Sequence, residues 1–213
     1  MSPYLFVPGP WEGDLATTAE QAHHLLKVLR MTPPFAVHYG DGQGARGQGT
    51  FTGEVILRGP EQLLSRTPPV LTMAVAPPDD RTRQRLMVEK LSELGCARLS
   101  WLTTRRTVGR PPGASKSGAW AASAFEQSRG TWLMEVGAPV AVADLPAGTW
   151  FAVPGAERAV LPPPAELVVA IGPEGGWADG EVPEGATTFG LGEGILRTET
   201  AAIAAAAFLR IAR

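Results

Sequence analysis

The sequence predicts an α/β fold with a mostly parallel sheet, preceded by a smaller unit that is rich in strands. Residues 70–102 alternate strand, helix and strand at the spacing of a βαβ unit, which requires parallel strands. Leu167–Ile171 is an apolar run with the length of a strand buried on both faces, and glycine follows it directly. Residues 35–57, in contrast, have the pattern of a β-hairpin.

The composition is typical of a globular protein from a reducing compartment. The chain has 213 residues, 44% of them hydrophobic, which suits one large domain or two small ones. Its net charge of −2 does not attract RNA globally, so RNA binding would need local basic patches. The single Cys96 excludes an internal disulfide and a cysteine-based metal site. No apolar run approaches the ~20 residues of a membrane span and Met1–Tyr4 does not resemble a signal peptide, so we expect a cytoplasmic protein.

The first 67 residues contain short elements separated by turns. Tyr4–Val7 is typical of a strand, and Thr17 with Glu20 has the form of a capping box for a helix over Ala19–Leu29. Its apolar positions fall at helical spacing on one face, which is predicted to be buried and leaves Lys27 and Arg30 facing outward; they are Ala22, Leu25, Leu26 and Leu29.

The hairpin comes next. We expect strands at Phe35–Tyr39 and Gln48–Leu57, joined by a turn at Gly40–Gly44. Arg66–Pro69 has paired prolines and is predicted to be a linker, which gives domains at 1–67 and 68–213.

The second domain opens with the βαβ unit. Val70–Ala76 is predicted to be a buried strand, Asp79-Asp80 supplies an N-cap for a helix that ends at Gly95, and Arg98–Leu102 is the returning strand.

Further elements follow in the second domain. A helix is predicted over Ala114–Ser128, a strand between Asp144 and Pro154, and a short strand over Thr188–Leu191. The final segment, Thr198–Arg213, is predicted to be an alanine-rich helix capped by Thr198 that packs closely against neighbouring backbone.

Two glycine-rich segments follow predicted strands. Gly172–Gly176 comes after one strand and Gly192–Arg197 after the next. Open α/β sheets bind ligands beyond the carboxyl ends of their strands, and glycine allows backbone groups to approach a ligand closely. These segments also contain or adjoin Glu174, Arg197 and Glu199, whereas ordinary tight turns would be served by Asn, Ser or Asp. We therefore predict a small-molecule site, with ordinary turns as the alternative.

Ile171–Gly176, together with Leu191-Gly192 and Ile195–Ala201, resembles the signature of the bacterial 16S ribosomal RNA uridine-N3 methyltransferases. These belong to the SPOUT superfamily of S-adenosylmethionine-dependent, trefoil-knotted enzymes. Two motifs in this order and at this distance are specific to that family.

The resemblance extends into the first domain. His23–Met31 and the Gly40–Gly42 turn are similar to the PUA-like barrel of the family. In the second domain, Lys90–Gly95 matches the family's Glu-Leu-Gly segment. The resemblance implies a PUA-like RNA-binding β-barrel over residues 1–67, a SPOUT domain with a C-terminal trefoil knot over 68–213, and a homodimer.

Two positions depart from the family pattern. Arg105 stands where the family usually has a glutamate in a Ser-Glu-Arg segment, and Glu193-Gly194 stands where it usually has Pro-Arg. The roles of those family residues are therefore not transferred to this chain.

The resemblance implies transfer of a methyl group from S-adenosylmethionine to N3 of a specific uridine in 16S ribosomal RNA of the small ribosomal subunit. The residues that would line the cofactor pocket are Val153, Pro154, Ile171, Gly172, Gly175, Gly176, Leu191, Gly192, Ile195 and Leu196. Basic residues outside this pocket are the candidates for RNA binding, namely Lys27, Arg30, Arg81, Arg83, Arg105, Arg106 and Arg129.

The chemistry requires that a uridine N3 proton be lost. Arg197 is predicted to stabilise negative charge on the uracil carbonyl oxygens, and Glu199 and Glu174 are candidate catalytic bases. Alternatively, Glu199 beside Thr198 satisfies N–H groups or the dipole at a helix start.

Two other functions remain open at this stage. One is a non-catalytic RNA-binding protein with a vestigial cofactor pocket, and the other is an enzyme that binds a nucleotide or phosphate in the glycine loops. No Lys-Ser or Lys-Thr follows the glycines, so a P-loop is excluded. His23 and His24 lack neighbours that would complete a metal site.

Overall fold

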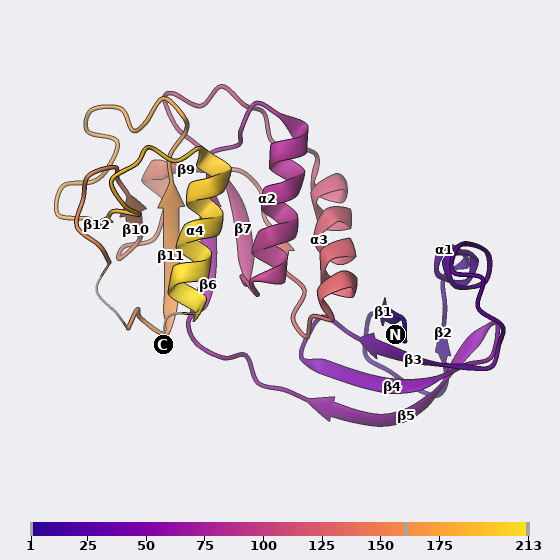
Figure 1. The fold of residues 1–213 in the computed structure, drawn as a ribbon. Coiled ribbons are helices and arrows are strands. Elements are labelled where there is room, and N and C mark those ends of the chain that lie inside the picture. The colour runs from indigo at the N-terminus through magenta and orange to yellow at the C-terminus, as the bar shows by residue number, and fades with distance from the viewer. Residues whose placement is uncertain (1, 160–161, 212–213) are drawn as a thin grey trace. The chain divides into compact units, whose positions relative to one another are not determined.

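A computed structural model describes residues 2–159 and 162–211 (Figure 1). The chain forms two compact units. The first contains the chain up to Arg66 and Phe125–Leu133, and the second contains Thr67–Ala124 and the chain from Met134 onward. The first break falls within the Arg66–Pro69 segment, but the return of residues 125–133 to the first unit was not anticipated from the sequence. None of the described helices has the length and apolar content that crossing a bilayer requires.

The first unit is built on a 5-stranded sheet in the order β1-β3-β4-β5-β2. β1 and β3 are parallel, whereas the other pairs are antiparallel. Leu25, Val37, Tyr39 and Phe51 are among the buried residues of its core. The strands are β1 (Tyr4–Phe6), β2 (Leu15–Ala16), β3 (Phe35–Gly40), β4 (Ala45–Phe51) and β5 (Val55–Leu63).

The predicted hairpin is longer than expected and contains an additional turn. The return strand predicted over Gln48–Leu57 is divided between β4 and β5. Gly53 has a φ of +116°, and the Thr52 N–H donates to the Val55 carbonyl over 2.9 Å, so the chain reverses there. Glycine permits this backbone conformation at little steric cost.

The helix of the first unit begins at Ala19 as predicted, but its capping box lies one residue later in the sequence. α1 (Ala19–His23) is capped by Thr18, which exchanges hydrogen bonds with Gln21, so the capping box does not use Thr17 and Glu20. The π-helical turn η1 (His24–Val28) continues it. Leu29 was predicted on the buried face but is 46% exposed. Because a π-turn has more residues than an α-turn, it shifts the residues after it around the helix axis.

The second unit is built on a 7-stranded sheet, with the order β12-β10-β11-β6-β7-β8 and β9 paired to β7. Every strand pair in it is parallel, as an α/β fold requires. Its strands are β6 (Val70–Val75), β7 (Arg98–Thr103), β8 (Glu135–Val136), β9 (Val140–Ala141), β10 (Trp150–Ala152), β11 (Glu166–Ile171) and β12 (Thr187–Phe189).

Helices α2 (Arg81–Glu93) and α4 (Thr198–Ile211) pack against one another, and α4 also contacts β6 and β11 (Figure 1). Asp80 caps α2 and Gly95, with a φ of +72°, follows its last turn, as predicted. In α4 the buried alanines Ala202, Ala205 and Ala206 allow the close contact with neighbouring elements. α3 spans Ala114–Ser128, the range predicted.

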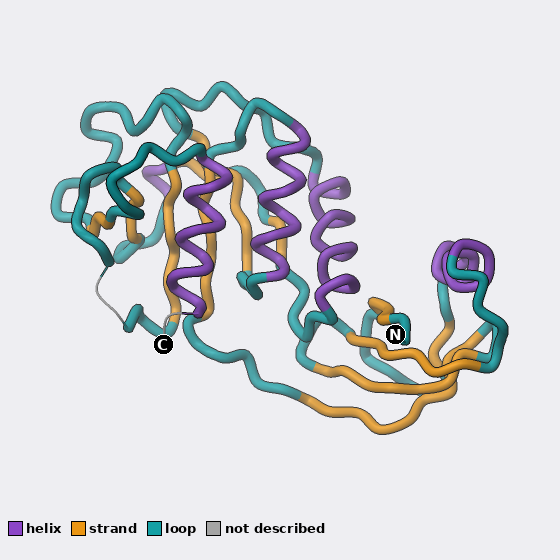
Figure 2. Tube along the Cα trace, in the orientation of Figure 1, coloured by secondary structure: helices purple, strands orange, loops and turns teal. Residues whose placement is uncertain are grey.

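Two expectations for the second unit need correction, and a third falls partly outside the described residues. The segment from Asp144 to Pro154 contains a strand only at Trp150–Ala152, because residues 142–144 form the 3₁₀ turn η2 (Val142–Asp144). The strand predicted at Thr188–Leu191 ends at Phe189. The final helix was predicted to continue to Arg213, but Ala212 and Arg213 lie outside the described residues. In Figure 2 the loops after β6, β7 and β11 gather at one end of the sheet.

Candidate functional site

A pocket in the second unit lies at the carboxyl ends of three strands. β10 is paired with β11 on one side and β12 on the other, so the loops that leave these strands come together. Parallel sheets expose such ligand-binding loops at the carboxyl ends of their strands. The residues that line the pocket are Ala152, Val153, Pro154, Ile171, Gly172, Pro173, Glu174, Gly176, Trp177, Leu191, Gly192, Gly194, Ile195, Leu196, Thr198 and Ala201.

Most of the predicted cofactor residues line this one pocket. They are Val153, Pro154, Ile171, Gly172, Gly176, Leu191, Gly192, Ile195 and Leu196.

Gly175 is the exception, because it lines a neighbouring hollow that it shares with Pro77, Pro78 and Arg106. Trp177 and Ala201 were not predicted as cofactor residues, although Trp177 directly follows the first motif and Ala201 is the last residue of the second.

Two glycines in the loops of the pocket have backbone conformations that other residues adopt only with strain. Gly176 has a φ of +70° and Gly192 a φ of +124°. A Cβ at Gly172 would lie 3.0 Å from the Trp177 ring, whose Nε1 donates to the Ala152 carbonyl over 2.9 Å. The loop after β11 is thus closed against the end of β10.

Thr198 joins the two signature segments directly. Its hydroxyl donates to the carbonyl oxygen of Gly172 over 3.2 Å. The sequence predicted Thr198 as the cap of the final helix, but α4 already includes Thr198, and the hydroxyl instead contacts the loop after β11. The start of α4 is therefore held against the pocket.

Three charged residues predicted to be catalytic lie around Arg83. The Arg83 guanidinium is hydrogen-bonded to Glu174 Oε1, and its Nη1 lies 3.8 Å from Glu199 Oε2. Arg197 lines an open hollow beside the pocket together with Asp80, Arg83 and Glu174. The hydrogen bond to Glu174 raises the pKa of Arg83, which keeps its charge at any ordinary pH.

Glu199 has an unusual environment for a carboxylate. Among the described residues it is the one charged residue that is buried, with 5% of its surface exposed. Its Oε2 has no hydrogen-bond partner among the described residues. Glu199 also lies in the first turn of α4, where an acid offsets the helix dipole. This position agrees with the alternative role predicted for it, that of stabilising the start of the helix.

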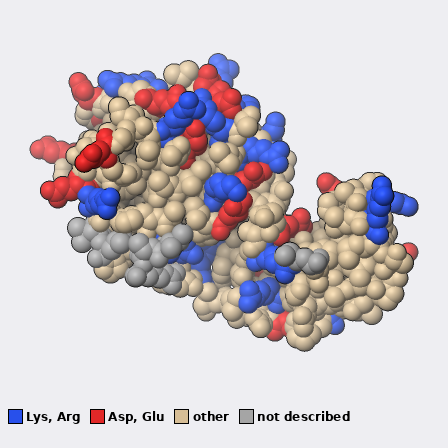
Figure 3. All heavy atoms as spheres, viewed as in Figure 1, with Lys and Arg blue, Asp and Glu red and all other residues tan. Residues whose placement is uncertain are grey.

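The predicted RNA-binding arginines of the second unit already have acceptors within the chain. Arg81 donates to Gln84 Oε1, Arg105 to the Asp179 carbonyl and Arg106 to the Gly175 carbonyl. Figure 3 shows basic and acidic side chains intermixed on the visible face, without one large basic area.

The first unit contains a second candidate surface. Arg129, with a φ of 55°, donates to the Ser2 carbonyl and lines a hollow with Arg46. The register of β1, β3 and β4 pairs Tyr4 with His38 and His38 with Gln48, so these side chains share one face of the sheet. Sequence reasoning missed Arg46, His38 and Gln48, because no residue motif distinguishes them from ordinary strand residues.

Lys27 and Arg30 lie elsewhere in the first unit. Lys27 is in η1, and Arg30 follows it with a φ of 53°. Neither lines the hollow that contains Arg129.

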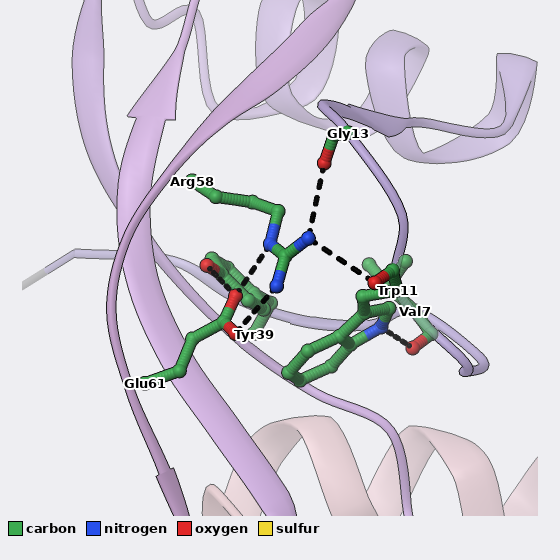
Figure 4. Close-up of polar contacts among 6 residues, drawn as sticks. All are labelled: Val7, Trp11, Gly13, Tyr39, Arg58 and Glu61. Carbon is green, nitrogen blue, oxygen red and sulfur yellow. Dashed lines mark hydrogen bonds and ion pairs between the residues drawn. The ribbon is translucent and has the colours of Figure 1, made fainter.

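A polar network joins β3 and β5 of the same sheet to the loop after β1 (Figure 4). Arg58 donates two hydrogen bonds of 2.7 Å to Glu61 and one of 3.1 Å to the Trp11 carbonyl. The Tyr39 hydroxyl donates to Glu61 over 2.8 Å. The hydrogen bonds from Arg58 lower the pKa of Glu61, whereas burial, followed by the bond to Glu61, raises the pKa of Tyr39 to about 12.

Comparison with known proteins assigns the family. The sequence model of the RNA methyltransferase domain matches residues 65–210, which is more than half of the chain. The chain belongs to the RNA methyltransferase family. A curated relative is the ribosomal RNA small subunit methyltransferase E of Synechocystis sp., which is 29% identical over 217 residues that cover 89% of this chain and 70% of the relative.

Solved structures share the fold of this family member. A methyltransferase of Legionella pneumophila in complex with the cofactor S-adenosylmethionine superposes with a TM-score of 0.86 at 23% identity, covering 100% of this chain and 98% of that one. A ribosomal RNA small subunit methyltransferase E of Neisseria gonorrhoeae, bound to S-adenosylmethionine, gives a TM-score of 0.83 at 23% identity and covers 97% and 96% of the two chains.

Proposed function

We propose that this RNA methyltransferase transfers a methyl group from S-adenosylmethionine to N3 of a uridine in 16S ribosomal RNA of the small ribosomal subunit. The observation that supports this most directly is the pocket at the ends of β10, β11 and β12, with Arg197 in the adjoining hollow. The Synechocystis sp. relative and the Neisseria gonorrhoeae neighbour are named ribosomal RNA small subunit methyltransferase E, and two solved neighbours are described with S-adenosylmethionine bound.

The residues of the pocket fit this cofactor. Ile171, Leu191 and Leu196 offer apolar contacts for adenosine, and the glycine segments offer backbone N–H and C=O groups for its polar edges. Glu174 is the one charged residue among those that line the pocket. Its Oε1 accepts from Arg83, so we take its other oxygen as the acceptor for the ammonium group of S-adenosylmethionine. When bound, this cofactor supplies the methyl group.

The chain's own residues would then act on the uridine. Arg197 has no ion pair or hydrogen bond from its side chain to any described residue, so its guanidinium is free to donate to a uracil carbonyl oxygen. That donation stabilises the negative charge that appears as the N3 proton leaves. Of the two glutamates we take Glu199 as the proton acceptor, because it has one unpartnered oxygen, whereas Glu174 already accepts a hydrogen bond from Arg83. Glu199 itself is not among the residues that line the pocket or the hollow.

We extend the proposal to the identity of the two domains and to the oligomeric state. We take residues 1–67 as a PUA-like RNA-binding β-barrel and 68–213 as a SPOUT domain with a C-terminal trefoil knot, paired as a homodimer. The buried alanine face of α4 supports close packing of this kind. The RNA would contact basic residues of both units, with Arg129 the most favourable of those predicted because it lines a hollow with Arg46.

Two experiments test the proposed function. Isothermal titration should show binding of S-adenosylmethionine and not of ATP, since ATP binding would favour a nucleotide enzyme. The purified chain should methylate small-subunit ribosomal RNA, and primer extension should stop at one uridine. Cofactor binding without any methylation of RNA or assembled subunits would favour a non-catalytic RNA-binding protein with a vestigial pocket.

A further inference from the structure

Arg83 connects two loops that are far apart in the sequence. Its backbone N–H donates to the Asp80 carboxylate over 2.9 Å, which holds the first turn of α2 in place. Its guanidinium then contacts Glu174 in the loop after β11 and lies near Glu199 in the first turn of α4. A single cation therefore serves carboxylates from both signature segments.

The buried carboxylate depends on this cation. The Glu199 side chain is 7% exposed, compared with 50% for the side chain of Glu174. A buried charge is costly unless an opposite charge lies close to it. Among the described residues, Arg83 is the one cation within 4.0 Å of Glu199, and at 3.8 Å it leaves Glu199 Oε2 without a hydrogen bond.

The same pairing keeps Arg197 free. Arg197, Glu174 and Arg83 line one hollow, so Arg197 is the next guanidinium available to Glu174. With Arg83 in place, the charge of Glu174 is already matched. Without Arg83, an unpaired carboxylate in the hollow would attract Arg197 and draw it away from a substrate.

We propose that Arg83 is a positioning residue: it holds Glu174 and Glu199 and thereby leaves Arg197 unpaired to meet the negative charge of the substrate. This inference rests on the proposed function. It assigns Arg83 to the catalytic site, in contrast to the RNA phosphate contact that its charge alone suggests.

The chain offers a matched control on the same helix. Arg85 forms an i,i+4 ion pair with Glu89 and its side chain is 56% exposed. Exposed pairs of this kind contribute little to stability. Arg85→Met therefore removes the same charge from α2 without touching either signature segment.

The test compares Arg83→Met, Arg83→Lys and Arg85→Met in the full chain. We expect Arg83→Met to lower kcat by roughly 10- to 100-fold, because losing a residue that acts through others should cost no more than losing one catalytic hydrogen-bond donor. The KM for RNA and the salt dependence of RNA binding should stay near wild type. Arg83→Lys should recover part of kcat, and Arg85→Met should change neither constant. A raised KM with a salt slope flattened by about 0.7 would show a phosphate contact and overturn the proposal.

A double-mutant cycle tests whether Arg83 acts through Glu199. Arg83→Met combined with Glu199→Gln should lose little more activity than the more damaging single variant, because residues that share one function are not additive. Additive losses would contradict this route. If Arg83→Met does not fold, the cycle is run with Arg83→Lys.

A readout without catalysis separates this inference from the proposed function. The side-chain NMR resonances of Arg197 should be those of a solvated guanidinium in the wild type, those of a paired one in Arg83→Met, and intermediate in Arg83→Lys. If the wild type fails to bind S-adenosylmethionine, the proposed function is wrong, while the Arg197 resonances still test the positioning role. Unchanged Arg197 resonances in a folded Arg83 variant would overturn it.

Discussion

The hydroxyl of Thr198 donates a hydrogen bond to the carbonyl oxygen of Gly172, which joins the first turn of α4 to the end of β11. Thr198 is buried, with 3% of its surface exposed. Because both residues line the pocket, this bond sets the distance between its two glycine segments.

Thr198→Val should therefore weaken cofactor binding and destabilise the second unit modestly. The variant keeps the shape of the side chain but leaves the half-buried Gly172 carbonyl without its donor, a loss of about 0.5–1.5 kcal/mol for one hydrogen bond. Thermal unfolding and titration with S-adenosylmethionine measure the two effects. Thr198→Ser retains the hydroxyl and should restore most of the affinity, so equal losses in both variants would contradict the role of the hydrogen bond.

Gly192→Ala should reduce affinity for S-adenosylmethionine, whereas Gly194→Ala should not. Neither added Cβ meets any atom within 4 Å, and both residues line the pocket. Gly192, however, has a φ of +124°, which an alanine adopts only with strain, so its loop must move. Titration of both variants measures the difference, and equal affinities would show that the conformation of Gly192 is irrelevant to binding.

The free energy of unfolding should fall as the pH rises from 10 to 12, because the two tyrosines of the chain ionise at a higher pH in the folded than in the unfolded state. Burial is the main cause that raises the pKa of both Tyr4 and Tyr39 from 10.0 to about 12. The unfolded chain therefore loses these protons first, so the stability present below pH 10 is lost through this interval.

Tyrosinate absorbance during a pH titration reports these two residues, and thermal unfolding at each pH reports stability. Tyr39→Phe should leave one titration step and a weaker fall in stability above pH 10. Titration of both tyrosines near the ordinary value in the folded chain would be inconsistent with the prediction.

Cys96 should react with thiol reagents only after unfolding. The residue is 1% exposed, and burial raises the pKa of its thiol to about 12. The thiolate is the reactive form, so both access and ionisation are lacking in the folded chain at neutral pH. Mass spectrometry should show one adduct in denaturant and none without it, with Cys96→Ala as the blank. Rapid labelling of the folded chain would refute this prediction.

The two groups of arginines should differ in their effect on RNA binding. All four arginines donate to acceptors within their own unit, but Arg46 and Arg129 together line one hollow of the first unit. We expect Arg46→Gln with Arg129→Gln to flatten the salt dependence of RNA affinity by about one to two units, at roughly 0.7 per phosphate on single strands.

The corresponding Arg105→Gln, Arg106→Gln pair is the comparison and should change the slope less. Both pairs remove the same charge, so the comparison isolates position. A larger effect from Arg105 and Arg106 would place the RNA on the second unit instead.

The sequence by itself determined the elements whose signals are local. Asp80 and Gly95 mark the ends of α2, and α3 was predicted within its observed bounds, because caps and apolar spacing act over a few residues. Residues of both glycine segments line the same pocket, since strand exits in a parallel sheet face one edge.

Only the tertiary structure decided what depends on distant contacts. The placement of β10 between β11 and β12 assembles the pocket, and no local pattern encodes strand order. Arg83 and Glu174 are 91 residues apart, so their pairing could not be predicted, and charge alone suggested RNA binding for Arg83. Residues 125–133 complete the first unit for the same reason: Tyr4 bonds to Gly130, 126 residues away. The sequence specifies local geometry, whereas long-range pairing follows from how the packed elements bury their apolar faces.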